Sequence, residues 1–188
     1  MRRVEVKDIE KELMALISPR NEGCIYCIHE KPLVFKSKDG EINEEYCKAN
    51  GLDICNSFNM GGIIVANTGD INMAIMKDEG WEVGKNLLND LAVELVKFIP
   101  NIKVDNNDLI VDDKYKVISY ASINANNRLI YTCVHISMNP NIDHISNVCM
   151  KPMVKVPKGL NDFGITAEQM VYILNKIIWQ QLLYSCKI

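Results

Sequence analysis

Hydrophobic positions along the chain follow two periods, one typical of strands and one of helices. Short apolar runs bounded by turn-forming residues predict strands at 24–29, 33–35, 52–55, 63–66, 71–76 and 128–138. Apolar residues at helical spacing predict helices at 6–17, 43–50, 81–99, 142–148 and 166–184, with 81–99 the longest. Helices interspersed among mostly sequential strands predict an α+β fold, with a mixed, largely antiparallel sheet flanked by helices.

Turn residues divide these segments. Asp112-Asp113-Lys114 separates two apolar runs, 109–111 and 117–121, and this pattern predicts a β-hairpin. Residues 67–70 are most simply a second hairpin turn, between the runs 63–66 and 71–76. Gly51 is placed to end the helix at 43–50, and Thr166 is placed to cap the last helix.

Lys116 enters the second strand of the predicted hairpin just past the turn. A lysine at a strand edge is usually a solvated residue or a guard against edge-to-edge aggregation. The local pattern alone favours this interpretation, because a charged side chain is rarely buried without a partner.

Composition narrows the class of protein. The chain has 188 residues, 48% hydrophobic and 24% charged, which predicts one globular domain over residues 1–188. A net charge of −3 argues against a nucleic-acid partner. No apolar run approaches the ~20 residues that cross a bilayer, and no apolar stretch follows the basic start, so we expect a cytoplasmic protein without a membrane partner.

The seven cysteines are irregularly spaced, as expected for reduced thiols in a cytoplasm. The pair Cys24 and Cys27 has metal-ligand spacing but lacks a second pair, so strand core is the simpler interpretation. The histidines His29, His135 and His144 are scattered, which favours surface or packed residues over ligands.

Two segments carry a more specific signal. Residues 56–72 read Asn-Ser-Phe-Asn-Met-Gly-Gly-Ile-Ile-Val-Ala-Asn-Thr-Gly-Asp-Ile-Asn, and residues 107–121 include Asn-Asp-Leu-Ile-Val-Asp-Asp and then Lys-Val-Ile-Ser-Tyr-Ala. In order and spacing these resemble the lipoate–protein ligase family, which has Arg-Arg-x-Ser-Gly-Gly-Gly, Gly-Asn-x-Asn, Asn-Asp-(Leu/Ile)-x-Val-Asp-Gly and Lys-(Ile/Val)-x-Gly-x-Ala. The likeness extends over residues 32–160, and it implies the catalytic-domain fold that lipoate ligases share with biotin–protein ligases.

The resemblance implies a chemistry. Family members bind lipoate or octanoate together with ATP, form an acyl-adenylate and pass the acyl group to a lysine of a lipoyl-carrier domain. It assigns Lys116 as the catalytic residue, in contact with the acyl carbonyl and the phosphate, and Asp108 as a ligand of Mg²⁺. The acyl and adenylate groups would contact residues of both segments: Gly61, Gly62, Asn67, Asn72, Asn107, Asp108, Ser119 and Ala121. An accessory subunit is a further expected partner.

This sequence departs from the family at several motif positions. Asn56 and Ser57 stand in place of the paired arginines, and neither reproduces their bidentate phosphate contacts. Met60 replaces a glycine and Ala66 a histidine. The sequence leaves open whether the protein is an active acyl ligase or transferase, a degenerate relative that has lost adenylation and binds a protein or ligand, or a small-molecule-binding protein of unrelated chemistry.

Overall fold

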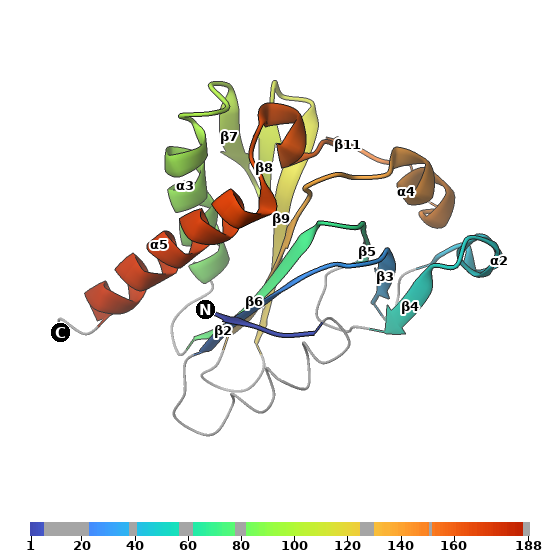
Figure 1. Cartoon of the computed structure of the whole chain (residues 1–188), viewed down its shortest axis with the longest axis horizontal. Coiled ribbons are helices and arrows are strands. Elements are labelled where there is room, and N and C mark those ends of the chain that lie inside the picture. Colours follow the sequence, from blue (N-terminus) through green and yellow to red (C-terminus); the bar gives the residue numbers. More distant parts are fainter. Residues whose placement is uncertain are drawn as a thin grey trace.

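The structure is a computed structural model that describes residues 1–5, 23–37, 41–56, 62–77, 82–124, 130–150 and 152–185. Its elements stack as helices, a large sheet, a small sheet and further helices (Figure 1). The large sheet has the order β1 (Arg2–Arg3), β2 (Gly23–Ile28), β6 (Ile71–Lys77), β10 (Ile130–Ile136), β9 (Tyr115–Asn124), β8 (Asp108–Val111) and β7 (Ile102–Asp105), with β11 (Val156–Pro157) beside β9. The small sheet has the order β4 (Asp53–Asn56), β3 (Leu33–Lys36) and β5 (Ile63–Ala66).

The pairing is mixed and mostly antiparallel, which confirms the predicted fold class. Within the described residues, β1 with β2, β9 with β11 and β3 with β4 are parallel, and the remaining strand pairs are antiparallel. The helices are α2 (Glu44–Ala49), α3 (Val83–Leu95), α4 (Ile142–Val148) and α5 (Ala167–Ser185), with a short 3-10 turn, η2, at Leu160–Phe163.

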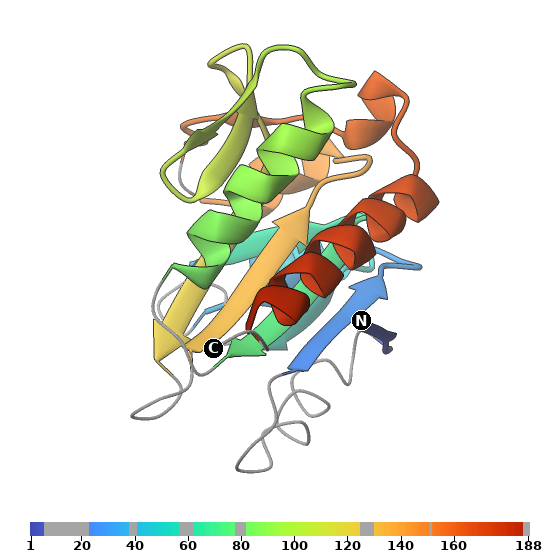
Figure 2. The same ribbon diagram turned by 90° about the vertical axis from the view of Figure 1, so that its left-hand side faces the viewer.

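Alternation along the strands assigns each side chain to one face of the large sheet. In β6, Ile71, Met73 and Ile75 pack on the helix side, whereas Ala74 and Met76 face the small sheet. All seven residues of β10 are buried, because helices cover one face of this strand and the small sheet approaches the other. Figure 2 shows α3 and α5 lying across the helix-covered face.

Capping residues lie at both ends of α2 and at the start of α5, where the sequence predicts Gly51 and Thr166. Asn43 Oδ1 accepts from the Tyr46 amide at 2.9 Å to cap α2, and Gly51 follows that helix with φ +64°. At the start of α5, Thr166 Oγ1 accepts from the Gln169 amide at 3.3 Å while Gln169 Oε1 accepts from the Thr166 amide at 2.8 Å. This reciprocal capping box satisfies two amide groups that the helix itself cannot pair.

Three sequence-based predictions about local structure are wrong. The longest described helix is α5 and not the helix at 81–99, whose described part is 13 residues against 19 for α5. Phe98 falls within the helix predicted at 81–99, but it lies past the end of α3 and is 50% exposed. Residues 67–70 do not form a hairpin turn, since β5 pairs with β3 in the small sheet while β6 pairs with β2 and β10 in the large sheet. The turn instead carries the chain between sheets, which strand periodicity alone cannot distinguish.

The remaining sequence-based predictions concern the hairpin and segments outside the described residues, and they omit two further strands. The hairpin at 109–121 is confirmed, with Asp112 and Asp113 in its turn at φ 53° and 58°. Strands β7 and β11 were not predicted. The predicted helix at 6–17 and the residue Trp81 lie outside the described residues. In the described chain, no helix combines the length and apolar character needed to span a membrane.

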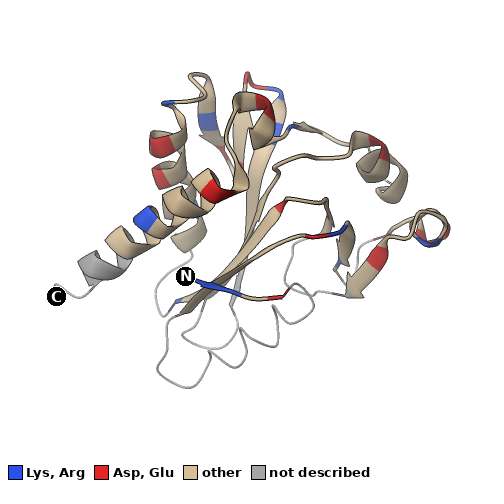
Figure 3. Cartoon of the chain, viewed as in Figure 1, with Lys and Arg blue, Asp and Glu red and all other residues tan. Residues whose placement is uncertain are grey.

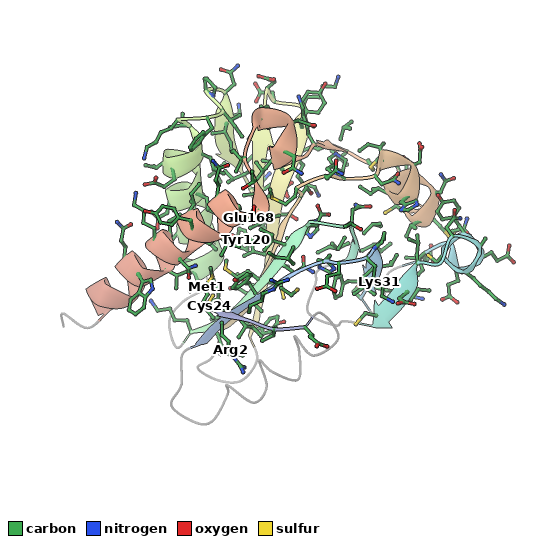
Figure 4. All side chains as sticks on the ribbon, viewed as in Figure 1. Met1, Arg2, Cys24, Lys31, Tyr120 and Glu168 are labelled. Atoms are coloured by element: carbon green, nitrogen blue, oxygen red, sulfur yellow. The ribbon has the colours of Figure 1, made fainter. Side chains whose placement is uncertain are left out.

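Gly84 in α3 generates a prediction about stability. A Cβ at this position would lie 2.2 Å from Tyr120 Cδ2, and Tyr120 packs between the sheet and the helices (Figure 4). Gly84→Ala should therefore lower the free energy of unfolding by about 1–3 kcal/mol, despite the better helix propensity of alanine. Urea denaturation measures the loss.

The exposed Lys85→Ala change in the same helix is the matched control, and it should alter the unfolding free energy by less than about 0.5 kcal/mol. Combining Gly84→Ala with Tyr120→Ala should remove most of the added penalty of the glycine change. An unaltered stability of Gly84→Ala would contradict the assigned contact.

Candidate functional site

A row of polar side chains crosses the large sheet on the face opposite the helices. The strand register places Asn72 of β6 opposite His135 of β10, His135 opposite Ser119 of β9, and Ser119 opposite Asp108 of β8. Helix-side packing of the alternate residues in each strand, such as Ile118 and Tyr120, fixes these four on the other face. Residues from four strands thus form one continuous polar row.

Small side chains lie next to this row. One step along the same strands, Ala121 is opposite Cys133, and Cys133 is opposite Ala74. Ser119 and Ala121 are half-buried, whereas Asn72 is completely buried. This combination of small apolar and short polar groups is typical of the floor of a binding site.

Lys116 belongs to the same face. A β-bulge between Leu109 and Ile110 places Lys116 opposite Ile110, whose neighbours Leu109 and Val111 pack against the helices. The Lys116 side chain is half-buried, and among the described residues its ammonium makes no hydrogen bond or ion pair. A partly buried, unneutralised ammonium is an anion-binding group.

The positive charge of Lys116 acts on the pKa values of two neighbouring groups, His135 and Cys149. Burial and then the Lys116 charge lower the pKa of His135 to about 3. Burial raises the pKa of the Cys149 thiol, and the Lys116 charge acts in the opposite sense. Lys116 therefore contributes positive potential to the polar row and to the end of α4.

The loop that contains Lys158 and Gly159 borders this face. The Lys158 amide donates to the Lys116 carbonyl at 2.9 Å, and the Leu160 amide donates to the Ser137 carbonyl at 2.9 Å. A Cβ at position 159 would lie 2.4 Å from the Met138 carbonyl oxygen, so glycine allows this close approach. The hydrogen bond from Lys158 thereby fixes the backbone position of Lys116.

A buried polar cluster adjoins the row at its β6 end. His135 Nδ1 lies 2.7 Å from Asn72 Oδ1, and His135 Nε2 lies 3.7 Å from Asp70 Oδ2. Asp70 is completely buried and accepts from the amides of Asn67, Met138 and Asn139 at 2.8, 2.7 and 3.2 Å. Burial raises the pKa of Asp70, and these backbone bonds act in the opposite sense.

His29 completes the cluster. Burial, and next to it the neighbouring His135, lowers the pKa of His29 to about 4. Neither ring nitrogen of His29 has a hydrogen-bond partner in the described part of the molecule. Its ring instead meets Phe35 edge-on, with centroids 5.7 Å apart. His29 is therefore held as a neutral, packed side chain.

At the other end of the row, Asp108 is engaged by an ammonium. Lys155 Nζ lies 2.6 Å from Asp105 Oδ2 and 3.5 Å from Asp108 Oδ2. Figure 3 shows charged residues gathered where β7, β8 and β9 meet. Mg²⁺ needs near-octahedral oxygen ligands, and in this arrangement a cation already binds the predicted ligand. Across the described residues, no group of three or more His, Cys, Asp or Glu residues could hold a metal ion. The residues therefore do not fit a Mg²⁺ site at Asp108 as they stand.

The structure brings most of the residues singled out in the sequence to one face. Lys116, Ser119, Ala121, Asn72 and Asp108 lie together there.

The others lie apart from the row or outside the described residues. Asn107 is exposed in the β7–β8 turn, where its carbonyl accepts from the Tyr120 amide. Asn67 is buried in the 67–70 turn and donates to the Val65 carbonyl at 3.2 Å. Gly62, with φ +145°, precedes β5, and Gly61 lies outside the described residues.

Three residues of the site were missed from the sequence. The sequence pattern favours a surface or packed residue at His135, and only the register of β10 against β6 and β9 places it inside the row. Asp70 looked like a turn residue, and Lys155 comes from a loop 47 positions away from Asp108. Strand alternation in residues 130–136 was the one local signal that could have indicated His135. The pair Cys24 and Cys27 belongs to strand core, with its members packing on opposite faces of β2.

Solved structures match over nearly the whole chain. An archaeal lipoylation system from Thermoplasma acidophilum, a bi-partite lipoate protein ligase and its E2 lipoyl domain, matches with TM-score 0.72 and 14% identity over 92% of this chain and 76% of that chain. Lipoate-protein ligase A bound with ATP matches with TM-score 0.67 and 15% identity over 88% and 74%. This chain has the fold of lipoate–protein ligases. The suspected resemblance is therefore confirmed at the level of the fold.

The lipoate-ligase fold recurs in a longer neighbour. LipL1 of Plasmodium falciparum in complex with lipoate matches with TM-score 0.70 and 13% identity, over 90% of this chain and 54% of that one. This chain thus spans about half the length of that protein. Neither a protein-family model nor a curated protein matches the sequence.

The buried histidines predict how stability depends on pH. His29 and His135 have pKa values of about 4 and about 3 in the folded protein, below the ordinary value of 6.5. Below pH 6.5 the unfolded chain therefore binds more protons than the folded one. The free energy of unfolding should fall as pH falls from 6.5 towards 4, by at most about 1.4 kcal/mol per pH unit for each histidine. Asp70, whose folded pKa is raised, offsets part of this loss at the acidic end.

Urea denaturation at pH 7.5, 6 and 5 measures this slope. His29→Leu should make it shallower, because one buried titrating group is removed. A leucine should be tolerated at pH 7.5, since the His29 ring nitrogens have no partners in the described residues that would be left unpaired. Equal unfolding free energies of the unaltered protein at pH 7.5 and 5 would contradict the assigned burial.

Proposed function

We propose that this protein transfers a lipoyl or octanoyl group from an acyl-adenylate to a lysine of a lipoyl-carrier domain. The observation that carries the proposal is Lys116, a half-buried ammonium beside Ser119 and His135 with no counter-charge among the described residues. A fold shared with lipoate–protein ligases supports it. The structural neighbours whose names mention lipoate and ATP support the choice of ligands.

The proposed reaction uses the charge of Lys116 where negative charge develops. The ε-amine of the carrier lysine attacks the carbonyl carbon of the acyl-adenylate, an amide bond forms, and the bond from that carbon to the phosphate oxygen breaks. AMP leaves with the electron pair of that bond, and the amine loses a proton to solvent. Lys116 would face both the carbonyl oxygen and the phosphate, and its fixed ammonium would stabilise the transition state more than the ground state.

Neighbouring groups have roles that fit this substrate. Ala121, Cys133 and Ala74 provide small side chains beside the row, and Cys133 and Ala74 belong to an apolar cluster, which suits contact with an acyl chain. The Ser119 hydroxyl lies between His135 and Asp108, where it can bond a polar part of the ligand. Gly61, Gly62, Asn67 and Asn107 stay proposed ligand contacts by resemblance. One structural neighbour is a bi-partite ligase, and by analogy we propose that adenylation here uses an accessory subunit.

A second candidate is a non-adenylating protein of the same fold that binds an acylated ligand or partner. Two observations favour it. Asn56 and Ser57 replace two arginines of the family motif, and Asp108 is engaged by Lys155. Incubation with ATP and lipoate shows whether this chain adenylates without an accessory subunit, because adenylation releases pyrophosphate. Supplying preformed lipoyl-adenylate together with a lipoyl-carrier domain then tests transfer by itself.

Lys116→Met tests the assigned role of this ammonium. Loss of a charge-assisted contact of about 1.5–3 kcal/mol should weaken binding of a non-hydrolysable lipoyl-adenylate analogue by about 10- to 150-fold. Isothermal titration calorimetry measures the affinity, and mass spectrometry of the carrier domain measures transfer from lipoyl-adenylate.

Lys114→Met is the matched control, because Lys114 is exposed in the hairpin turn only two residues away. It should leave affinity and transfer unchanged. Equal affinity of the Lys116→Met and unaltered proteins would remove Lys116 from the site. Failure of the unaltered protein to bind lipoate, ATP or the analogue would overturn the proposed function.

A further inference from the structure

The β7–β8 hairpin forces two carboxylates together. Asp105 and Asp108 are directly opposed at its turn end, where Asn106 has φ 54°. Opposed residues of an antiparallel pair have Cβ atoms only about 5 Å apart, so two like charges here repel each other. A cation next to both carboxylates relieves this repulsion.

Lys155 supplies that cation from a distant segment. Its ammonium lies 2.6 Å from Asp105 Oδ2 and 3.5 Å from Asp108 Oδ2, and only 20% of its side chain is exposed. The hydrogen bond to Asp105 is the main cause of a raised Lys155 pKa, so the side chain stays charged. Pairing of Val156 with Tyr115, directly after Lys155, fixes the backbone from which the ammonium reaches the hairpin.

The position of this ammonium connects it to the polar row. Asp108 is opposite Ser119, and Ser119 is opposite His135, so the Asp105–Lys155–Asp108 group forms one end of the row. A divalent cation bound to Asp108 Oδ2 would compete with Lys155 for that oxygen. The group has a net charge of −1, and the two Oδ2 atoms become available to a metal only when the ammonium leaves.

We propose that Lys155 takes the place of a divalent cation at this face, so that the site binds its ligand without Mg²⁺ at Asp108. Given the proposed function, a phosphate of the acyl-adenylate would meet the ammonium of Lys116, which has no counter-charge among the described residues, while Lys155 and not a metal ion lies between Asp105 and Asp108. This site thus differs from a magnesium-dependent site, because the cation between Asp105 and Asp108 is an ammonium group and not a metal ion. Asp105 and Asp108 act as positioning residues for Lys155.

Titration with Mn²⁺, followed by electron paramagnetic resonance, tests this assignment on the whole chain without any acyl ligand. Mn²⁺ prefers the same oxygen ligands as Mg²⁺. The unaltered protein should show no Mn²⁺ binding that depends on Asp108. Lys155→Met frees both carboxylates and should bind Mn²⁺ at least about 10-fold more tightly, and adding Asp108→Asn should abolish this gain. Lys155→Arg, which retains a cation, should behave like the unaltered protein.

Lys103→Met is the matched control, because Lys103 is paired with the single carboxylate Asp113 on the neighbouring hairpin end. It should gain no Mn²⁺ site. Three results would each overturn the proposal: Mn²⁺ binding by the unaltered protein that Asp108→Asn removes, no gain in a folded Lys155→Met protein, or an equal gain in Lys103→Met. Mn²⁺ binding by the unaltered protein can be tested even if the Lys155→Met protein does not fold. Because no acyl ligand is present, these outcomes are distinct from failure of the proposed acyl transfer.

Discussion

The antiparallel register of β10 between β6 and β9 is the constraint on which the rest of the structure depends. Every residue of β10 is buried, so each of its polar side chains must find a partner on a neighbouring strand. Thr132 Oγ1 lies 2.7 Å from Ser122 Oγ in β9, and His135 bonds Asn72 in β6. A shift by one residue would turn His135 under the helices and expose Val134 to the small sheet. The same register that builds the core therefore builds the polar row.

Charge is distributed unevenly along that row. At one end, Asp70 is surrounded by backbone amides and buried histidines. At the other end, Asp105 and Asp108 are bound by Lys155. Lys116 lies between these ends, and of the three positions it is the one whose charge has no partner among the described residues. This difference, rather than the number of charged groups, makes Lys116 the best candidate for binding an anionic ligand.

Local signals predicted much of the fold. Capping residues such as Asn43 and Thr166, and the Asp112-Asp113 turn, act through the backbone of their own neighbours and can be read without knowing the rest of the chain. The assignment of β5 and β6 to different sheets could not be read this way, because both strands show the same apolar character. The helix predicted at 81–99 extends too far, because the apolar spacing continues through Phe98 after α3 has ended.

The sequence by itself determined most of the elements, the fold class through motif order, and the candidates Lys116, Asn72, Asp108, Ser119 and Ala121. Only the tertiary structure decided that His135 joins these residues and that Asp108 is bound to Lys155. The physical reason is distance along the chain. Hydrogen bonding in caps and turns acts over a few residues, whereas strand register joins positions 63 residues apart and ion pairing joins positions 47 residues apart. Those contacts are fixed by the packing of the whole sheet, and no local pattern encodes them.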